Sequence, residues 1–193
     1  MTGTDRLKKA AAAVVIAGCA LLVIGDAVRI VAGSSDASIP GGVGWFTQAV
    51  GAMLVVPGLP ALYARQAQSA PVLGLMAFVG LNLFMFLFGI FGGLLHSLVV
   101  VELARSDPNA AIRPVSVALS FFAGSMGAVV GGTGFGGAVI RGKGFPSHAG
   151  ILAAVGGILL FIGHPLGMHI EDAGLWLLLG GVADGAWAVF RQA

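Results

Sequence analysis

The stretch AAAAVVIAGCALLVIGDAVRIVA, residues 10–32, decides the fold of this chain because it is apolar except at two positions. A helix needs about twenty apolar residues to cross roughly 30 Å of hydrocarbon, and this stretch is long enough. The two exceptions are Asp26 and Arg29, which are three positions apart and therefore share one helix face. The stretch predicts a membrane span with a carboxylate that needs a partner, water or a function.

The composition of the whole chain is that of an integral membrane protein. Of its 193 residues, 58% are hydrophobic and 9% are charged, whereas soluble domains contain about 25% charged residues. With a net charge of +2, the charge balance points to no particular partner, and we expect membrane lipid and a hydrophobic small molecule rather than nucleic acid. The single cysteine, Cys19, excludes an intramolecular disulfide and a cysteine-based metal cluster.

Hydropathy in a window of about nineteen residues predicts six spans. Their expected ranges are 10–32, 44–64, 72–101, 115–140, 148–168 and 174–190. The connecting segments are short and contain turn-forming residues, so we expect no second domain. The predicted fold is an all-α, polytopic membrane bundle of six transmembrane helices that forms a single domain over residues 1–193.

The basic residues predict how the bundle is oriented. When the loops are assigned alternately to the two sides of the membrane, one side collects Arg6, Lys8, Lys9, Arg65, Arg141, Lys143 and Arg191. The other side has Arg105 and Arg113. Because short cytoplasmic loops carry the excess of basic residues, we expect a multi-pass protein of the cell membrane with both termini in the cytoplasm.

The fourth predicted span is rich in glycine, with seven of them at Gly124, Gly127, Gly131, Gly132, Gly134, Gly136 and Gly137. Its segment GGTGFGG has neither the strand-to-helix context nor the lysine of a phosphate-binding loop. We therefore expect these glycines to let a neighbouring helix approach closely.

Two acids within the spans, Asp26 and Asp184, are the candidate catalytic residues. By helical rise, Asp26 lies about 9 Å and Asp184 about 15 Å from the outer ends of their spans. An acid at such a depth must be satisfied by other helices or by water. The alternative for Asp26 is an ion pair with Arg29, and the alternative for Asp184 is a hydrogen bond that serves structure alone.

The last predicted span carries a continuous face that we name the tryptophan stripe. It consists of Trp176, Gly180, Asp184, Trp187 and Arg191, at spacings of four, four, three and four. These spacings place all five residues on one side of a helix. The stripe combines two indoles, a gap in side-chain volume and a carboxylate, although Trp187 also suits the inner aromatic belt of a membrane protein.

A second candidate pocket wall lies on the third span. At the spacing of an α-helix, Asn82, Phe86, Gly89, Gly93 and His96 fall on one face. The alternative is that Asn82 bonds to another helix and that the glycines serve helix contacts. The second span adds two aromatic candidates for substrate contact, which are Trp45 and Tyr63.

Three histidines gather near the outer ends of the third and fifth spans: His96, His164 and His169. Histidines and a carboxylate suit a metal, and two histidines on different helices suit a haem. No His-Glu-x-x-His pattern is present, however, so we expect neither a metal nor a cofactor and assign His96 and His164 to substrate contact. Asp172 is expected to cap the N-terminus of the last helix.

Inward-facing acids, aromatic rings and few fixed positive charges together suit an isoprenoid substrate. Protonation of an alkene or epoxide needs a carboxylic acid kept neutral by burial, and aromatic faces stabilise the carbocation that follows. We therefore predict a membrane-embedded isoprenoid or terpene cyclase or isomerase, with Asp26 and Asp184 as candidate acids. The predicted substrate contacts are Trp45, Tyr63, Asn82, Phe86, His96, His164, Trp176 and Trp187.

The same plan, a small multi-span chain with isolated acids in aromatic-lined helices, resembles the integral membrane terpene cyclases, including bacterial ones that act on prenylated metabolites. The resemblance is architectural, covers the whole chain and transfers no catalytic residue. The DxDD motif of soluble proton-initiated cyclases is absent. The stretch LPALYARQ, residues 59–66, is also similar to uncharacterised actinobacterial membrane proteins.

Two other functions stay open at the level of the sequence. A lipid-, haem- or quinone-binding membrane subunit would depend on the outer histidines. A small proton-coupled transporter would depend on the internal acids, although the first three and last three spans show no convincing repeat. The sequence does not predict the oligomeric state.

Overall fold

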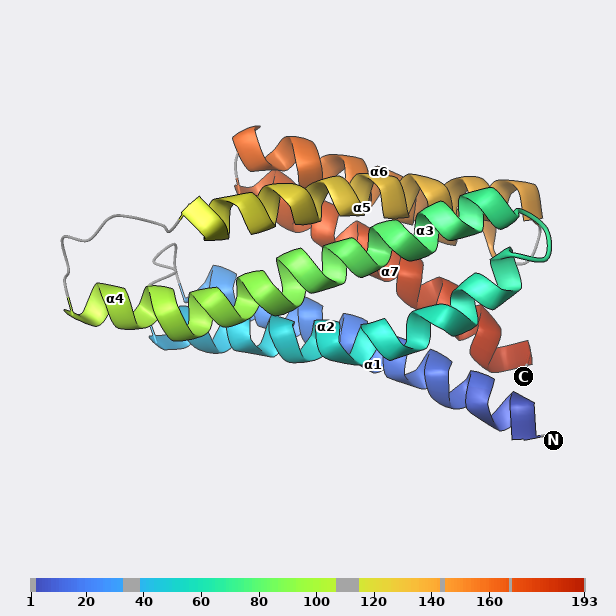
Figure 1. Ribbon diagram of the computed structural model, residues 1–193, viewed down its shortest axis with the longest axis horizontal. Coiled ribbons are helices and arrows are strands. Elements are labelled where there is room, and N and C mark those ends of the chain that lie inside the picture. The colour runs from blue at the N-terminus through green and yellow to red at the C-terminus, as the bar shows by residue number, and fades with distance from the viewer. Residues whose placement is uncertain (1–2, 33–38, 107–114, 143–144, 167, 193) are drawn as a thin grey trace.

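The computed structural model describes residues 3–32, 39–106, 115–142, 145–166 and 168–192. These residues are helical apart from short turns. The elements are α1 (Gly3–Val31), α2 (Ile39–Gln66), α3 (Pro71–Leu83), η1 (Phe84–Gly92), η2 (Leu95–Val100), α4 (Val101–Ser106), α5 (Val115–Gly142), α6 (Ser147–Leu166) and α7 (Met168–Gln192). The elements from α3 to α4 follow one another as one continuous rod, so the described chain forms six long rods (Figure 1).

Five of the described helices are long and apolar enough to cross a membrane: Gly3–Val31, Ile39–Gln66, Pro71–Leu103, Ala118–Gly142 and His169–Gln192. The segment Ser147–Gly163 of α6 is a shorter apolar helix. The prediction of an all-α, multi-span helical protein is therefore confirmed, with each of the six predicted spans matched by one rod.

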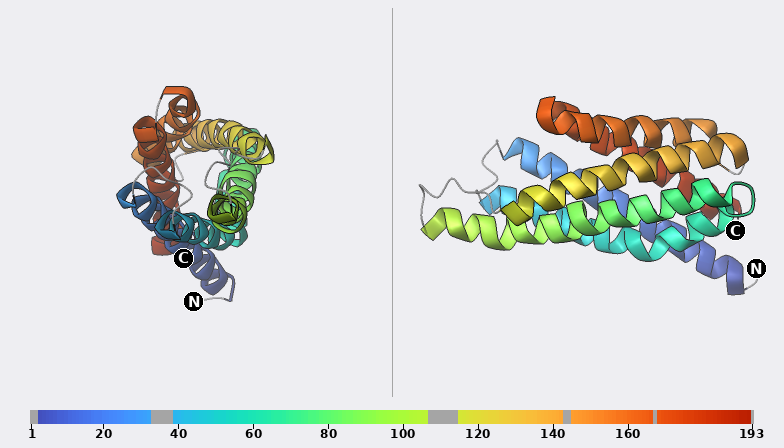
Figure 2. Two further views of the ribbon diagram at one scale, coloured as in Figure 1. Left: turned by 90° about the vertical axis from the view of Figure 1, so that its left-hand side faces the viewer. Right: turned by 45° about the horizontal axis from the view of Figure 1, so that its top comes forward.

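The six rods form a closed ring. Each rod packs against the rods that precede and follow it in the chain, and α7 closes the ring by packing against α1 (Figure 2). The interior is filled by large apolar side chains, among them Phe84, Phe135, Leu22 and Leu178. The first and last helices are therefore neighbours, although they lie more than a hundred residues apart in sequence.

The rods approach closely where glycines face one another. A Cβ atom built on Gly25 of α1 would lie 2.6 Å from the carbonyl oxygen of Gly44 on α2, and the reverse distance is 2.7 Å. Gly80 of α3 faces Gly131 of α5 in the same way, backbone against backbone. The expectation that glycines of the fourth span serve helix packing is thus confirmed.

The third rod departs from α geometry, because η1 and η2 are π-helical. Their hydrogen bonds run from i to i+5, which changes how side chains are distributed around the rod. Phe86 is 59% exposed while His96 is 1% exposed, so the expectation that these two residues share one face is wrong. Residues that would share one face of an α-helix point in different directions when the turns are π-helical, because each π-helical turn contains more residues.

The junction between α6 and α7 also differs from the sequence-based expectation. The segment 169–173, expected to connect two spans, belongs to the first turns of α7. Asp172 is therefore inside the helix and buried, and it is not the N-cap that we expected. The reason is an ion pair between Asp172 and Arg29 of α1, which draws this turn of α7 into the bundle.

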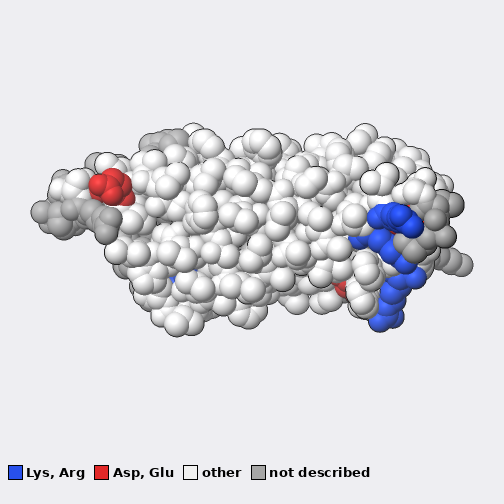
Figure 3. Space-filling view, turned by 90° about the horizontal axis from the view of Figure 1, so that it is seen from below, with Lys and Arg blue, Asp and Glu red and all other residues white. Residues whose placement is uncertain are grey.

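Both termini lie at one end of the bundle, and the basic side chains gather at that end (Figures 1 and 3). Six crossings bring a chain back to the side on which it started, so the positions of the termini agree with an even number of spans. The side of the membrane on which this basic end lies is still a prediction.

We predict that both termini are cytoplasmic, because the basic end of a multi-span protein faces the cytoplasm. Fusing a reporter that is active only in the cytoplasm to the N-terminus, and separately to the C-terminus, should give signal in both cases. Signal from one terminus alone would contradict the six-span arrangement, and signal from neither would reverse the orientation.

Replacing Gly80 by alanine should lower the free energy of unfolding by about 1–3 kcal/mol, because the added methyl group would collide with the backbone of Gly131. Gly180 is a matched control, since no neighbouring atom of the described residues lies within 4 Å of a Cβ built there. Unfolding in detergent should show Gly180→Ala to be as stable as the original protein or more so. Equal stability of the two variants would contradict the proposed α3–α5 contact.

Candidate functional site

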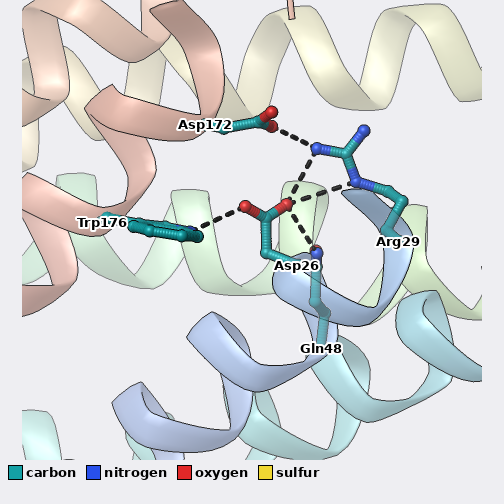
Figure 4. A network of polar contacts seen from close by, with 5 residues as sticks. All are labelled: Asp26, Arg29, Gln48, Asp172 and Trp176. Atoms are coloured by element: carbon teal, nitrogen blue, oxygen red, sulfur yellow. Dashed lines mark hydrogen bonds and ion pairs between the residues drawn. The ribbon is translucent and has the colours of Figure 1, made fainter. Parts of the chain in front are cut away.

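Asp26 lies at the centre of a buried polar network. Its side chain is fully buried, with 0% exposed, and it accepts four hydrogen bonds from three helices (Figure 4). Arg29 donates through Nη2 at 2.8 Å and Nε at 3.2 Å. Gln48 of α2 donates through Nε2 at 3.2 Å, and Trp176 of α7 through Nε1 at 2.8 Å.

Arg29 connects Asp26 to a second acid. Its Nη2 also donates to Oδ1 of Asp172 on α7, so one guanidinium lies between two carboxylates. We call these five residues, Asp26, Arg29, Gln48, Asp172 and Trp176, the Asp26 network. If all three charged groups are ionised, the network carries a net charge of −1.

The hydrogen bonds identify Asp26 as a carboxylate. All four bonds are donated by N–H groups, and two of them come from the guanidinium of Arg29. A guanidinium nitrogen at 2.8 Å is the arrangement expected of an ion pair. The local ion pair that the sequence offered as an alternative is therefore present, and it is extended by two other helices.

Trp45 and His96 belong to an aromatic cluster beside this network. Their rings stack with centroids 4.5 Å apart and an interplanar angle of 23°. Phe121 lies edge-on to both rings, at 5.2 Å from Trp45 and 5.3 Å from His96. The guanidinium carbon of Arg29 lies 5.2 Å from the centroid of the Trp45 ring, so the cluster covers one face of the ion pair.

The predicted histidine group is not assembled in the described part of the structure. His96 lies within the aromatic cluster, His169 is exposed on α7, and the side chain of His164 lies outside the described residues. Among the side chains that are described, no group of three or more His, Cys, Asp or Glu could hold a metal ion.

Asp184 belongs to a different site, at the basic end of the bundle. It lies eight residues before the last residue of α7, which is about 12 Å along the helix. Its Oδ2 is 2.7 Å from Nε2 of His148, the second residue of α6. The Asp184 side chain is 29% exposed and that of His148 is 68% exposed, although Oδ2 of Asp184 is itself buried and accepts no well-aligned hydrogen bond among the described residues.

A cavity of about 510 Å³, which we call the Asp184 cavity, surrounds this pair. Its lining residues are Phe145, Pro146, His148, Asp184, Trp187, Ala188, Arg191 and Gln192. Two of them contribute aromatic faces, and the guanidinium carbon of Arg191 lies 4.9 Å from the centroid of Trp187. The cavity thus combines apolar side chains with one acid, one imidazole, one guanidinium and one amide.

Sequence reasoning missed His148. Asp184 had no basic neighbour one turn away in its own span, and the partner comes from the start of a neighbouring helix instead. The available signal was position: His148 follows the loop at the inner end of the fifth span, and the inner part of the sixth span must pass nearby.

The tryptophan stripe lies on the outer face of α7. Trp176 and Trp187 are both exposed, and Gly180 between them leaves a gap in side-chain volume. The stripe connects the two sites, because Trp176 belongs to the Asp26 network while Trp187 lines the Asp184 cavity. The two acids themselves do not meet.

Three further predicted contact residues lie apart from both sites. Tyr63 packs against Phe78, with ring centroids 5.3 Å apart. Asn82 donates from Nδ2 to the carbonyl oxygen of Phe78 at 2.7 Å, within its own helix. Phe86 points to the exterior of the bundle.

The chain matches no protein-family model, no curated protein and no solved structure. What the structure supports of the resemblance to the integral membrane terpene cyclases is the multi-span helical architecture.

Replacing Asp26 by asparagine should destabilise the protein by about 3–5 kcal/mol, because it leaves the buried Arg29 without its nearest charge partner. The substitution also places the NH₂ group of asparagine, which is a donor, opposite N–H groups that are themselves donors. Asp172→Asn is the matched control, since it leaves the Asp26–Arg29 pair intact and the network neutral. Thermal unfolding in detergent should separate the two variants clearly, and a larger loss for Asp172→Asn would contradict the central position of Asp26.

Proposed function

We propose that this protein is a membrane-embedded enzyme that cyclises or isomerises an isoprenoid-like substrate by acid–base chemistry, with Asp184 and His148 as the reacting pair. The observation that carries the proposal is the 2.7 Å contact between these two side chains on the wall of the Asp184 cavity. General acid–base catalysis needs such groups within hydrogen-bond reach of the reacting atoms of the substrate, and both side chains line the cavity that would hold it.

The pair can complete a catalytic cycle without gain or loss of a proton. Asp184 in its acid form gives its proton to one carbon of an alkene, which leaves a carbocation on the other carbon. After rearrangement or ring closure, neutral His148 removes a proton from the carbon beside the cation and a double bond forms. The imidazolium then returns its proton to Asp184 across the 2.7 Å contact, so the product has the mass of the substrate.

The cavity also offers stabilisation for a carbocation. Phe145 and Trp187 line it, and each ring already lies beneath a guanidinium group, with Arg65 over Phe145 at 5.2 Å and Arg191 over Trp187 at 4.9 Å. Rings in such positions attract positive charge, typically by about 0.5–2 kcal/mol. Because each guanidinium already occupies one face of its ring and repels a second cation, the two rings would stabilise a carbocation through their opposite faces.

Asp26 has a different part in this proposal from the one expected from the sequence. Its four N–H donors hold a carboxylate, and a proton donor needs an acid. We therefore assign the donation of a proton to the substrate to Asp184 and not to Asp26, and we assign Asp26 to the closure of the ring between α1 and α7.

A second function, proton-coupled transport, draws support from a separate observation. Asp26, Arg29 and Asp172 carry a net charge of −1 when ionised, and His169 is a further titratable group near Asp172. A bound proton would neutralise this net charge, and intramembrane acids often belong to proton pathways. Substrate flux into proteoliposomes that depends on a proton gradient would favour this function over the enzyme.

Replacing Asp184 by asparagine should lower turnover by about 10²- to 10⁴-fold, because the variant has no proton to transfer. The measurement uses purified protein in lipid nanodiscs with prenylated substrates in D₂O, and it seeks products that differ from the substrate by one deuterium for hydrogen. Asn82→Ala is the control, because Asn82 lies apart from both sites, and it should retain turnover.

Two outcomes would contradict the enzyme proposal. Full turnover in Asp184→Asn would show that Asp184 is not the proton donor. If the original protein gave no deuterated product with any prenylated alkene, the proposal of a cyclase or isomerase would be wrong.

A further inference from the structure

A second cavity lies at the same end of the bundle, and it differs in charge from the first. It measures about 420 Å³, and we call it the Lys8 cavity. Its lining residues are Asp5, Lys8, Ala61, Ala64, Arg65, Gln68, Ser69, Gly142, Val189 and Gln192. They supply two basic side chains against one acid, together with amide and hydroxyl donors.

The two cavities adjoin. Gln192 lines both of them, and its Oε1 accepts a hydrogen bond from Nη2 of Arg65. Arg65 lines the Lys8 cavity, while its guanidinium also lies over Phe145, a wall of the Asp184 cavity. The side chains of Arg65 and Gln192 therefore lie between the two cavities.

We propose that the Lys8 cavity binds the phosphate group of a membrane amphiphile whose hydrocarbon chain occupies the Asp184 cavity. This inference rests on the proposed function and narrows its substrate class to isoprenyl phosphates. Arginine presents a planar fork of donors that matches phosphate oxygens, lysine adds a point charge, and Gln68 and Ser69 can donate to the remaining oxygens.

The position of the cavity favours a phosphate on an amphiphile over a soluble anion. Lys8, Arg65 and Gln192 lie near the ends of α1, α2 and α7, where the bundle meets the polar edge of the bilayer. A headgroup at this level would leave its chain beside Phe145, Pro146, Trp187 and Ala188, which are the apolar side chains of the Asp184 cavity.

The test compares dodecyl phosphate with dodecanol, which have the same saturated chain and differ only in the headgroup. Neither contains an alkene, so binding is measured without any turnover and does not depend on the proposed chemistry. With protein in phosphatidylcholine nanodiscs, calorimetry should show tighter binding of dodecyl phosphate, and Arg65→Gln should weaken it about ten-fold while leaving dodecanol unchanged.

Lys8→Gln is a second variant with the same expected direction, and it keeps the test valid if Arg65→Gln fails to fold. Arg141→Gln is the matched control, because Arg141 is exposed at the same end of the bundle and lines neither cavity. It should bind dodecyl phosphate as the original protein does, which separates a built site from general attraction to a basic surface.

Three results would overturn the inference. Equal affinity for dodecyl phosphate and dodecanol would show that the cavity does not recognise the phosphate. Equal weakening of dodecyl phosphate binding by Arg141→Gln would show that only the general positive charge of this end attracts the ligand. Displacement by inorganic phosphate at the affinity of dodecyl phosphate would make the ligand a soluble anion. Each of them leaves the turnover assay with Asp184→Asn unaffected, so the enzyme proposal stands or fails separately.

Discussion

The ion pair between Asp26 and Arg29 is the interaction on which the rest of the bundle depends. A charged pair removed from water is stable only when further hydrogen bonds satisfy its remaining oxygens and protons. Asp26 obtains these bonds from α2 through Gln48 and from α7 through Trp176, and Arg29 obtains one from α7 through Asp172. The network therefore fixes the positions of both helices relative to α1, and it closes the ring of rods.

Close backbone contact makes this network possible. The Gly25–Gly44 crossing lies beside it, and a Cβ on Gly25 would lie 2.8 Å from Cγ of Gln48, while a Cβ on Gly44 would lie 3.1 Å from the backbone nitrogen of Arg29. Larger residues at either position would separate α1 from α2 and move Gln48 away from Asp26. The packing by small residues and the burial of the ion pair are thus parts of one arrangement, in which van der Waals contact brings the polar groups within bonding distance.

The sequence predicted what depends on local pattern. Hydropathy located the six helical rods, glycine spacing indicated close crossings, and i,i+3 spacing indicated the Asp26–Arg29 pair. The predictions and the structure differ where residues distant in the sequence interact. Asp172 pairs with Arg29 of another helix and lies inside α7, and His148 of α6 contacts Asp184 of the neighbouring helix α7. The π-helical turns of the third rod were likewise not predicted, because no residue pattern in that segment distinguishes them from α-helix.

The two acids differ in role because their surroundings differ. Asp26 is enclosed by four N–H donors, whereas Asp184 is partly exposed, has an imidazole as its neighbour and lines a cavity. The tryptophan stripe nevertheless links them, because Trp176 bonds to Asp26 and lies eight residues before Asp184 on the same face, about 12 Å along α7. In the proposed enzyme, the buried network thus has an indirect function: by fixing Trp176 it sets the rotation of α7, and the rotation of α7 decides whether Asp184 faces His148.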